Sequence, residues 1–129
     1  MLESSIQVNQ SDMNLAGHVD NVNLYRWFND QRLELFDIIS SRVGQPFVPP
    51  YVKTELQFMR EVFDHEAVLL RLNICHIGGK SFRIEQQLMQ DQTLCAICET
   101  TAVNFSVESQ SACVIEGSVK AALESFSRK

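Results

Sequence analysis

Hydrophobic and polar residues alternate with a different period in different parts of the chain, and each period predicts a different element. Residues 3–9 alternate weakly, which predicts a short strand, and residues 10–20 are polar, which predicts a loop. From about residue 21 to residue 41 the apolar residues recur at helical spacing, so we expect a helix of roughly five to six turns. Asp20 or Asn21 can cap the start of this helix.

The second half of the chain predicts an antiparallel meander. Gly44 followed by Pro46 ends the helix, and the segment 44–50, which holds all the prolines, predicts a loop. Three or four long strands are expected to follow, within residues 51–62, 66–77, 82–88 and 94–102. Gly78-Gly79 and Asp91-Gln92 predict tight turns between them. A final segment, from about residue 115 to residue 126, predicts a helix of weak periodicity.

The last predicted strand has an uneven pattern. Val103 and Phe105 fall on the face opposite to its other apolar residues unless a bulge intervenes. Those other residues are Leu94, Ala96, Cys98 and Ala102. A sheet wrapped around the long apolar helix would bury that helix, so we expect an α+β fold in which residues 1–129 form a single domain.

The composition is that of an ordinary globular protein, and it narrows the choice of partners. The chain has 129 residues, a mass of 14.7 kDa, 45% hydrophobic residues and a formal net charge of −5. This charge balance, with no cluster of Lys and Arg, argues against a nucleic-acid partner. The sequence also has no apolar run of about 18 residues, the length that a membrane-spanning helix needs. The N-terminus does not resemble a signal peptide, so we expect a cytoplasmic protein whose four cysteines are free thiols.

The densest group of polar residues lies in the segment 12–21, directly before the predicted helix. Helix N-termini carry unpaired backbone N–H groups, which can stabilise an oxygen that gains negative charge. Gly17 allows a ligand to approach the backbone closely, and His18 stands beside these donors. The alternative interpretation is that the Asp and Asn residues of this segment only form turns and caps, as these residue types usually do.

The order of residues in this segment resembles the signature of the hotdog-fold acyl thioesterases. It reads Asp12-x-Asn14-x-x-Gly17-His18-Val19-x-Asn21, followed by a helix with Tyr25, Phe28 and Arg32-Leu33-Glu34. Two later segments agree in the same order, namely Glu55-Leu56-Gln57-Phe58-Met59-Arg60 and the turn Ile77-Gly78-Gly79-Lys80-Ser81-Phe82. The resemblance covers roughly residues 3–106 and is closest to the branch of 4-hydroxybenzoyl-CoA and acyl-carrier-protein thioesterases.

This resemblance implies an antiparallel sheet wrapped around one central helix, in a homodimer or a dimer of dimers with active sites at the interface. It implies hydrolysis of an acyl-CoA or acyl-carrier-protein thioester to an acid and a thiol, with no cofactor and no metal. The backbone amides of Gly17, His18 and Val19 would bind the thioester carbonyl. His18 would also orient water or the carbonyl oxygen.

Further positions would contact the substrate if the resemblance holds. Asn21 belongs to the signature, and Ser81 matches a serine that lies near the thioester or CoA in the family. Arg60, Lys80 and Arg83 are local cations that could bind the CoA phosphates. The alternative for these three cations is an ordinary solvated surface.

Two positions depart from the family's pattern. The acid that acts as base or nucleophile lies four positions before the histidine, and Asn14 stands there; the second acid of the plant-type branch corresponds to Gln57. An amide can contact the substrate but cannot take up a proton at neutral pH. Three alternatives follow: Glu55 or Asp12 supplies the carboxylate, His18 is itself the base while Asn14 and Gln57 hold water, or the fold binds a thioester and hydrolyses it slowly or not at all. A hotdog dehydratase is a weaker alternative, because its own motif is not evident.

Other patterns support no competing chemistry. Cys95 and Cys98 have metal-ligand spacing, but residues three apart in a strand point to opposite faces, so we expect core cysteines. His65 and His76 are expected to be structural or exposed. The sequence has no His-x-x-x-His, glycine-rich phosphate loop or Gly-x-Ser-x-Gly motif, so it gives no support for a metal hydrolase, a nucleotide site or a serine hydrolase.

Overall fold

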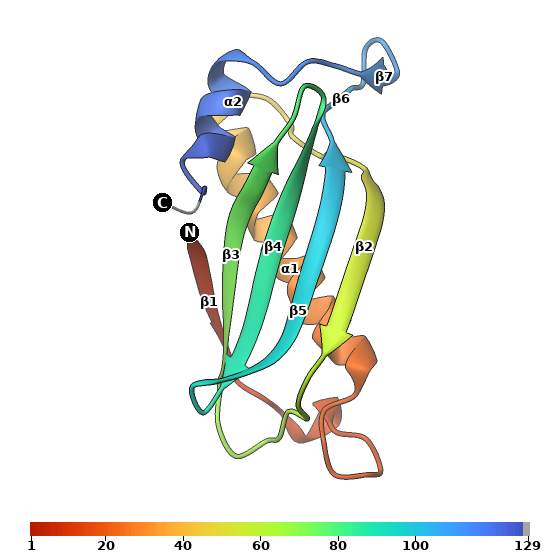
Figure 1. Cartoon of the computed structure of the whole chain (residues 1–129), viewed down its shortest axis with the longest axis vertical. Coiled ribbons are helices and arrows are strands. Elements are labelled where there is room, and N and C mark those ends of the chain that lie inside the picture. The colour runs from red at the N-terminus through yellow and green to blue at the C-terminus, as the bar shows by residue number, and fades with distance from the viewer. Residues whose placement is uncertain (128–129) are drawn as a thin grey trace.

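One antiparallel sheet and one long helix dominate the structure, a computed structural model that describes residues 1–127 (Figure 1). Five strands pair in the order β1–β3–β4–β5–β2, and each neighbouring pair is antiparallel. Their bounds are β1 Leu2–Ile6, β2 Tyr51–Phe58, β3 Val68–Ile77, β4 Ser81–Gln90 and β5 Thr93–Val103. The prediction of an α+β fold with a long meander is confirmed.

Helix α1 (Asn21–Val43) lies along one face of the sheet and starts and stops at specific caps (Figure 1). The Asp20 carboxylate accepts a hydrogen bond from the Val22 N–H at 2.9 Å. At the other end Gly44 adopts a left-handed conformation with φ of 75°, which glycine tolerates without a steric cost. The predicted start and end of the helix are therefore confirmed.

The core consists of two apolar clusters along α1. The loop-side cluster packs the first half of α1 against β3, β4, β5 and the loops before α1 and after β2; its buried members include Leu24, Trp27, Phe28, Val19, Val62, Val68, Leu70, Leu88, Cys95, Ala96 and Cys98. The α2-side cluster packs the second half of α1 against the sheet and against helix α2 (Gly117–Glu124); its buried members include Leu35, Phe36, Ile39, Phe47, Phe82, Ile84, Ile115, Leu123 and Phe126. The sequence predicted α2 within residues 115–126, and the structure confirms it.

A polar layer lies under the middle of α1. Arg32 is completely buried, and its Nη1 donates to the Gln86 Oε1 at 2.9 Å and to the Cys98 Sγ at 3.3 Å. Its guanidinium carbon lies 4.8 Å from the ring centroid of Tyr51. The Arg32 Nε has no hydrogen-bond partner among the described residues. A permanent positive charge is thus held by neutral acceptors and aromatic rings.

Strand β2 ends four residues earlier than the pattern of residues 51–62 predicts. The backbone N–H groups of Met59 and Arg60 both donate to the Cys95 carbonyl oxygen, at 2.8 and 3.1 Å, and so the chain leaves the sheet there. The sequence also did not predict the short helix η1 (Gln10–Asp12) or the hairpin of β6 (Phe105–Ser106) and β7 (Ser111–Ala112). No helix in residues 1–127 is both long and apolar enough to cross a membrane.

Strand β5 carries a β-bulge at Cys95, between Leu94 and Ala96, and its regular register beyond the bulge leaves Val103 on the face opposite to Ala102. Leu88 pairs with Ala96 whereas Met89 pairs with Leu94, so Cys95 is the extra residue. The bulge changes the direction of the side chains, and both Cys95 and Cys98 are buried in the loop-side cluster. They are core cysteines as predicted, but the prediction that they point to opposite faces of the strand is wrong.

Candidate functional site

The loop before α1 owes its shape to Asn14. The Asn14 side-chain oxygen accepts hydrogen bonds from the backbone N–H of Ala16 at 2.9 Å and of His18 at 3.4 Å. The Asn14 backbone closes the same turn, because its N–H donates to the His18 carbonyl at 2.8 Å. Gly17 has φ of 85°, a conformation that other residues adopt at a cost. The Asn14 side chain thus has a structural role, because it holds the turn that carries Gly17 and His18.

The backbone amides expected to bind a thioester carbonyl already have acceptors within the chain. The Gly17 N–H donates to the Asn14 carbonyl at 3.1 Å, and the Val19 N–H donates to the Val62 carbonyl at 2.7 Å. Within residues 1–127, the His18 N–H has only the long bond of 3.4 Å to the Asn14 side chain. Of the three expected donors, the His18 amide is therefore the one most easily redirected to a ligand.

The His18 ring is paired with an acid that the sequence analysis did not single out. His18 Nδ1 lies 3.0 Å from the Glu61 Oε2, and the side chains are 27% and 56% exposed. Because a carboxylate can only accept a hydrogen bond, Glu61 favours the tautomer with the proton on His18 Nδ1, which leaves the lone pair of Nε2 free. The Asn14 Nδ2 also lies 3.3 Å from Nδ1, but two donors cannot bond to one another, so we assign this as a contact.

Glu61 is placed by the segment 59–67, which connects β2 to β3. The chain is fixed just before Glu61 by the two bonds to the Cys95 carbonyl and just after it by Val62, which is 1% exposed and bonded to Val19. A small surface depression of about 220 Å³ lies beside Glu61. Its lining residues are Asn21, Phe58, Met59, Arg60 and Glu61. The structure thus brings Asn21 and Arg60, both predicted site residues, to the same place as Glu61.

The carboxylate of Asp12 serves the local fold. Its Oδ2 accepts the Asn9 N–H at 2.9 Å, which caps η1. The Asp12 carbonyl accepts the Asp20 N–H at 3.1 Å and the Asn23 side-chain amide at 3.0 Å, which joins η1 to the start of α1. The observed contacts of Asp12 are therefore those of a cap.

The carboxylate of Glu55 is paired with Lys53 on the exposed face of β2. The Lys53 Nζ lies 2.7 Å from the Glu55 Oε1, and both side chains are at least 60% exposed. The hydrogen bond and charge of Lys53 lower the pKa of Glu55, and Glu55 in turn raises the pKa of Lys53. Gln57, two residues further along β2, is also exposed. A carboxylate with a lowered pKa is a weaker base, so its environment does not favour Glu55 for proton uptake.

The remaining predicted site residues lie at the other end of the sheet. Ser81 and Lys80 are at the turn between β3 and β4, whereas the loop before α1 is at the opposite end of the sheet (Figure 1). Arg83 follows on β4, where its Nη1 lies 3.6 Å from the Glu99 Oε1. Within one chain, Ser81, Lys80 and Arg83 are therefore not assembled with His18.

Glu61 could not be found from spacing along the sequence. It is 43 positions from His18, and the contact depends on where β2 ends and on how the segment 59–67 folds back. The end of β2 in turn depends on the bulge at Cys95. The only sequence signal was a group of acids around the junction of two predicted strands, which is common near exposed loops.

Comparisons with known proteins agree with this architecture. The sequence matches the family model of the thioesterase-like superfamily over residues 8–123. No curated protein matches the sequence significantly. A predicted thioesterase from Bacillus stearothermophilus superposes with a TM-score of 0.87 at 19% identity, over 98% of this chain and 96% of that one. The probable thioesterase YbaW from Escherichia coli superposes with a TM-score of 0.85 at 16% identity, over 99% of this chain and all of that one (100%).

These findings establish the fold and the family. The solved structures are too distant in sequence to transfer an activity, but their likeness over almost the whole chain confirms the predicted hotdog fold. The family match covers the loop before α1, all of α1 and the strands β2 to β5. The chain belongs to the thioesterase-like superfamily.

Proposed function

We propose that this protein hydrolyses an acyl-CoA or acyl-carrier-protein thioester, with His18 as the general base. The observation that carries the proposal is the 3.0 Å contact between His18 Nδ1 and Glu61. The Glu61 carboxylate fixes the tautomer in which Nε2 can accept a proton, and it stabilises the imidazolium that forms. The Glu61 carboxylate thus fills the role that neither Asn14 nor Gln57 can fill as an amide.

The reaction follows from this arrangement. His18 Nε2 takes a proton from water while the water oxygen attacks the thioester carbonyl carbon, which gives a tetrahedral oxyanion. The His18 N–H is the donor best placed to bind that oxyanion, because its present bond is the weak one of 3.4 Å. When the C–S bond breaks, the imidazolium returns the proton to the leaving thiolate. The products are a free acid and a thiol, and no cofactor enters the balance.

The proposal includes a homodimer formed along β2. One side of β2 pairs with β5, and its other side pairs with no strand of residues 1–127. Val52, Phe58 and Met59 are exposed large apolar residues on or next to this edge. Antiparallel pairing of two β2 strands about a two-fold axis would cover them, and it would bring the far end of the second sheet toward His18. Ser81, Lys80 and Arg83 of a second copy could then reach the substrate's CoA portion. A dimer of dimers would require a further surface.

The fold is also compatible with a protein that binds a thioester without hydrolysing it. The observation that favours this alternative is that each predicted carboxylate has another partner, Asp12 in the η1 cap and Glu55 in the pair with Lys53. In that case Asn14 and Gln57 would hold the ligand by hydrogen bonds, and the His18–Glu61 pair would only order the loop.

All four cysteines are free, which fits the expected cytoplasmic location.

Thioester hydrolysis is tested by following thiol release from a panel of aliphatic and aromatic acyl-CoAs and acyl carrier proteins. We expect His18→Ala to lower kcat/KM by about 10²- to 10⁴-fold, because a general base is lost. Glu55→Gln is the matched control and should leave kcat/KM unchanged. Full activity of His18→Ala would contradict the role of His18. No turnover by the natural protein, combined with turnover by Asn14→Asp, would favour the binding protein.

A further inference from the structure

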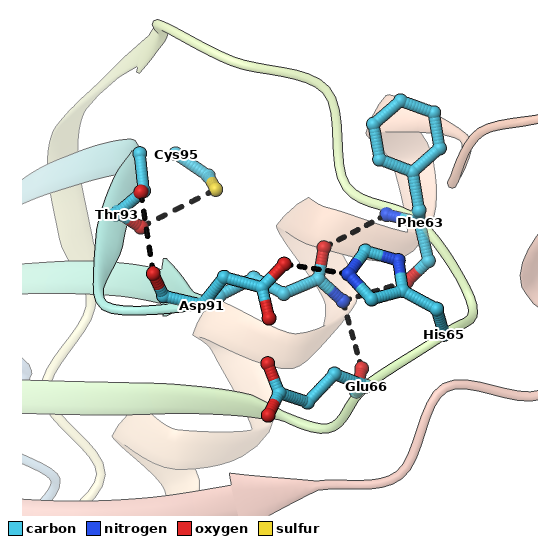
Figure 2. Close-up of polar contacts among 7 residues, drawn as sticks. Phe63, His65, Glu66, Asp91, Thr93 and Cys95 are labelled. Carbon is cyan, nitrogen blue, oxygen red and sulfur yellow. Dashed lines mark hydrogen bonds and ion pairs between the residues drawn. The ribbon is translucent and has the colours of Figure 1, made fainter.

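A cluster of side chains that could ligate a metal ion includes two residues of the segment that carries Glu61. His65 and Glu66 come from the connection between β2 and β3, and Asp91 comes from the turn between β4 and β5 (Figure 2). One ligand atom from each residue lies within 4.8 Å of the other two, and all three side chains are exposed. His65 Nε2 lies 2.5 Å from the Asp91 Oδ2. These residues are distinct from those that surround His18.

The backbone that presents these three residues is fixed by a buried side chain. Gln90 is 5% exposed, its Oε1 accepts the Phe63 N–H at 3.0 Å, and its Nε2 donates to the carbonyls of Phe63 and Glu66, both at 2.7 Å (Figure 2). Asp91 follows directly, and its φ of 55° with a φ of 60° at Gln92 gives the tight turn of a two-residue hairpin. The backbone positions of the three residues are therefore set before any ion arrives.

We propose that His65, Glu66 and Asp91 bind a divalent first-row transition metal ion such as Zn²⁺. An imidazole nitrogen and two carboxylates suit such ions, and two negative charges balance the charge of one dication. Metal–ligand distances of about 2.0–2.2 Å put ligand atoms roughly 3.3–3.5 Å apart in a tetrahedral site. The ion would take the place of the hydrogen bond between His65 and Asp91, and their ligand atoms would move apart by about 1 Å. The Glu66 carboxylate would move toward the ion.

The surroundings leave room for the ion and for water ligands. Glu66 and Asp91 line an open surface depression, so solvent can reach the site. Arg71 lines the same depression, and its Nε donates to the Glu3 Oε2 at 3.0 Å. Three protein ligands with the remaining position open to water would make this an exchangeable site and not a closed structural one.

Binding at this site would tie the connection after β2 to the β4–β5 turn. The same connection carries Glu61 and Val62, which contact His18 and Val19. A bound ion would thereby restrict the segment that orients the proposed base, so metal could modulate hydrolysis from outside the active site. Only this consequence rests on the proposed function, since the ligand set would bind an ion whether or not the protein is a hydrolase.

The binding test uses the full chain without an affinity tag, titrated with Zn²⁺ by calorimetry. We expect one binding event, weakened about 100-fold or more in His65→Ala and in Asp91→Asn, because each removes a ligand. His76→Ala is the matched control, since His76 is also an exposed histidine, and it should bind as the natural protein does. Equal affinity in the natural protein, His65→Ala and Asp91→Asn would overturn the proposal, as would no binding at all.

Two further measurements keep the result specific. The Co²⁺-loaded protein should show a visible spectrum without a thiolate charge-transfer band; that band would instead place the ion on a cysteine and overturn the assignment. Zn²⁺ should slow amide hydrogen exchange in residues 59–67 of the natural protein but not of His65→Ala. Loss of thioester hydrolysis in the earlier assay would leave both results unaffected, so failure of one proposal is distinguishable from failure of the other.

Discussion

The two ends of α1 are closed by different kinds of interaction. At the α2 side, aromatic side chains pack in contact: Phe36 lies edge-on to Phe47 with ring centroids 5.7 Å apart, and Phe47 stacks on Phe82 at 6.0 Å. At the other end, the segments before α1 and after β2 are joined mainly by polar bonds, such as Val19 to Val62 and His18 to Glu61. Both ends enclose an apolar cluster, and the loop side also brings the His18 ring and the Glu61 carboxylate together at the surface.

The two ends therefore have different roles: the α2 side stabilises the fold, and the loop side fixes the positions of polar side chains. Apolar contact is favourable at many relative positions of two segments, whereas hydrogen bonds hold one position within a few tenths of an ångström. The α2 side therefore suits a region whose task is to keep the fold together. The loop side suits a region in which a histidine and a carboxylate must meet at a fixed distance. The predictions below test whether stability and activity divide between the two ends in this way.

The largest effect is expected for Phe82→Ala at the α2 side. Phe82 is completely buried and stacks on Phe47, so its truncation leaves a cavity and should lower the free energy of unfolding by about 3–5 kcal/mol. Urea denaturation measures the change. Phe105→Ala, which removes a 37% exposed ring of β6, should change it by less than about 0.5 kcal/mol. Similar losses in the free energy of unfolding for the two variants would contradict the prediction that the buried ring contributes more to stability than the exposed one.

A smaller loss of stability, confined to the loop side, is expected for Gln90→Leu. The substitution removes three hydrogen bonds to Phe63 and Glu66 and should cost about 1–3 kcal/mol. Hydrogen exchange should become faster in residues 59–67 and remain unchanged in α2. Gln87→Leu, on the same strand but half-buried, is the control. Faster exchange spread evenly over the whole chain would contradict a local tether.

Glu61→Gln should change activity more than stability. The amide keeps the size of the side chain but no longer stabilises an imidazolium, so kcat/KM should fall about tenfold to a hundredfold. The urea midpoint should hardly move, because Glu61 is more than half exposed. Glu108→Gln, in the exposed β6–β7 hairpin, is the control for kcat/KM. An unchanged rate in Glu61→Gln would remove Glu61 from the mechanism.

The smallest effect concerns the ion pair on β2. Lys53 holds the pKa of Glu55 below its usual value, so the pair is intact at neutral pH and is lost as the pH falls through that lowered pKa. An NMR titration should show the Glu55 pKa rising toward its ordinary value in Lys53→Ala. High salt should have a similar effect, since both side chains are exposed. A Glu55 pKa that does not respond to Lys53→Ala would contradict this pairing.

Most of the fold could be predicted because its signals are local. The caps Asp20 and Gly44 are visible as single residues, and the alternation of β3 and β4 needs only neighbouring positions. The end of β2 and the bulge at Cys95 were not predicted in place, because each depends on the other across two strands. Single-sequence patterns do not record such pairs.

The candidate site was predicted only in part for the same reason. The segment around Asn14 and His18 is contiguous, so its residues could be named from their order. Glu61 and the cluster of His65 with Asp91 are assembled by contacts between residues 43 and 26 positions apart. Glu55 was one of the two expected carboxylates because it shares a strand face with Gln57, but a shared face does not reveal that Glu55 is paired with Lys53.

The buried Arg32 limits how α1 can move on the sheet. If the helix slid by one turn, the guanidinium would leave the Gln86 oxygen and enter the apolar clusters on either side, where an unpaired charge is costly. Arg32 therefore permits only one position of α1 along its own axis relative to the sheet. Since α1 begins only three residues after His18, this position also fixes where the His18 loop lies relative to the sheet.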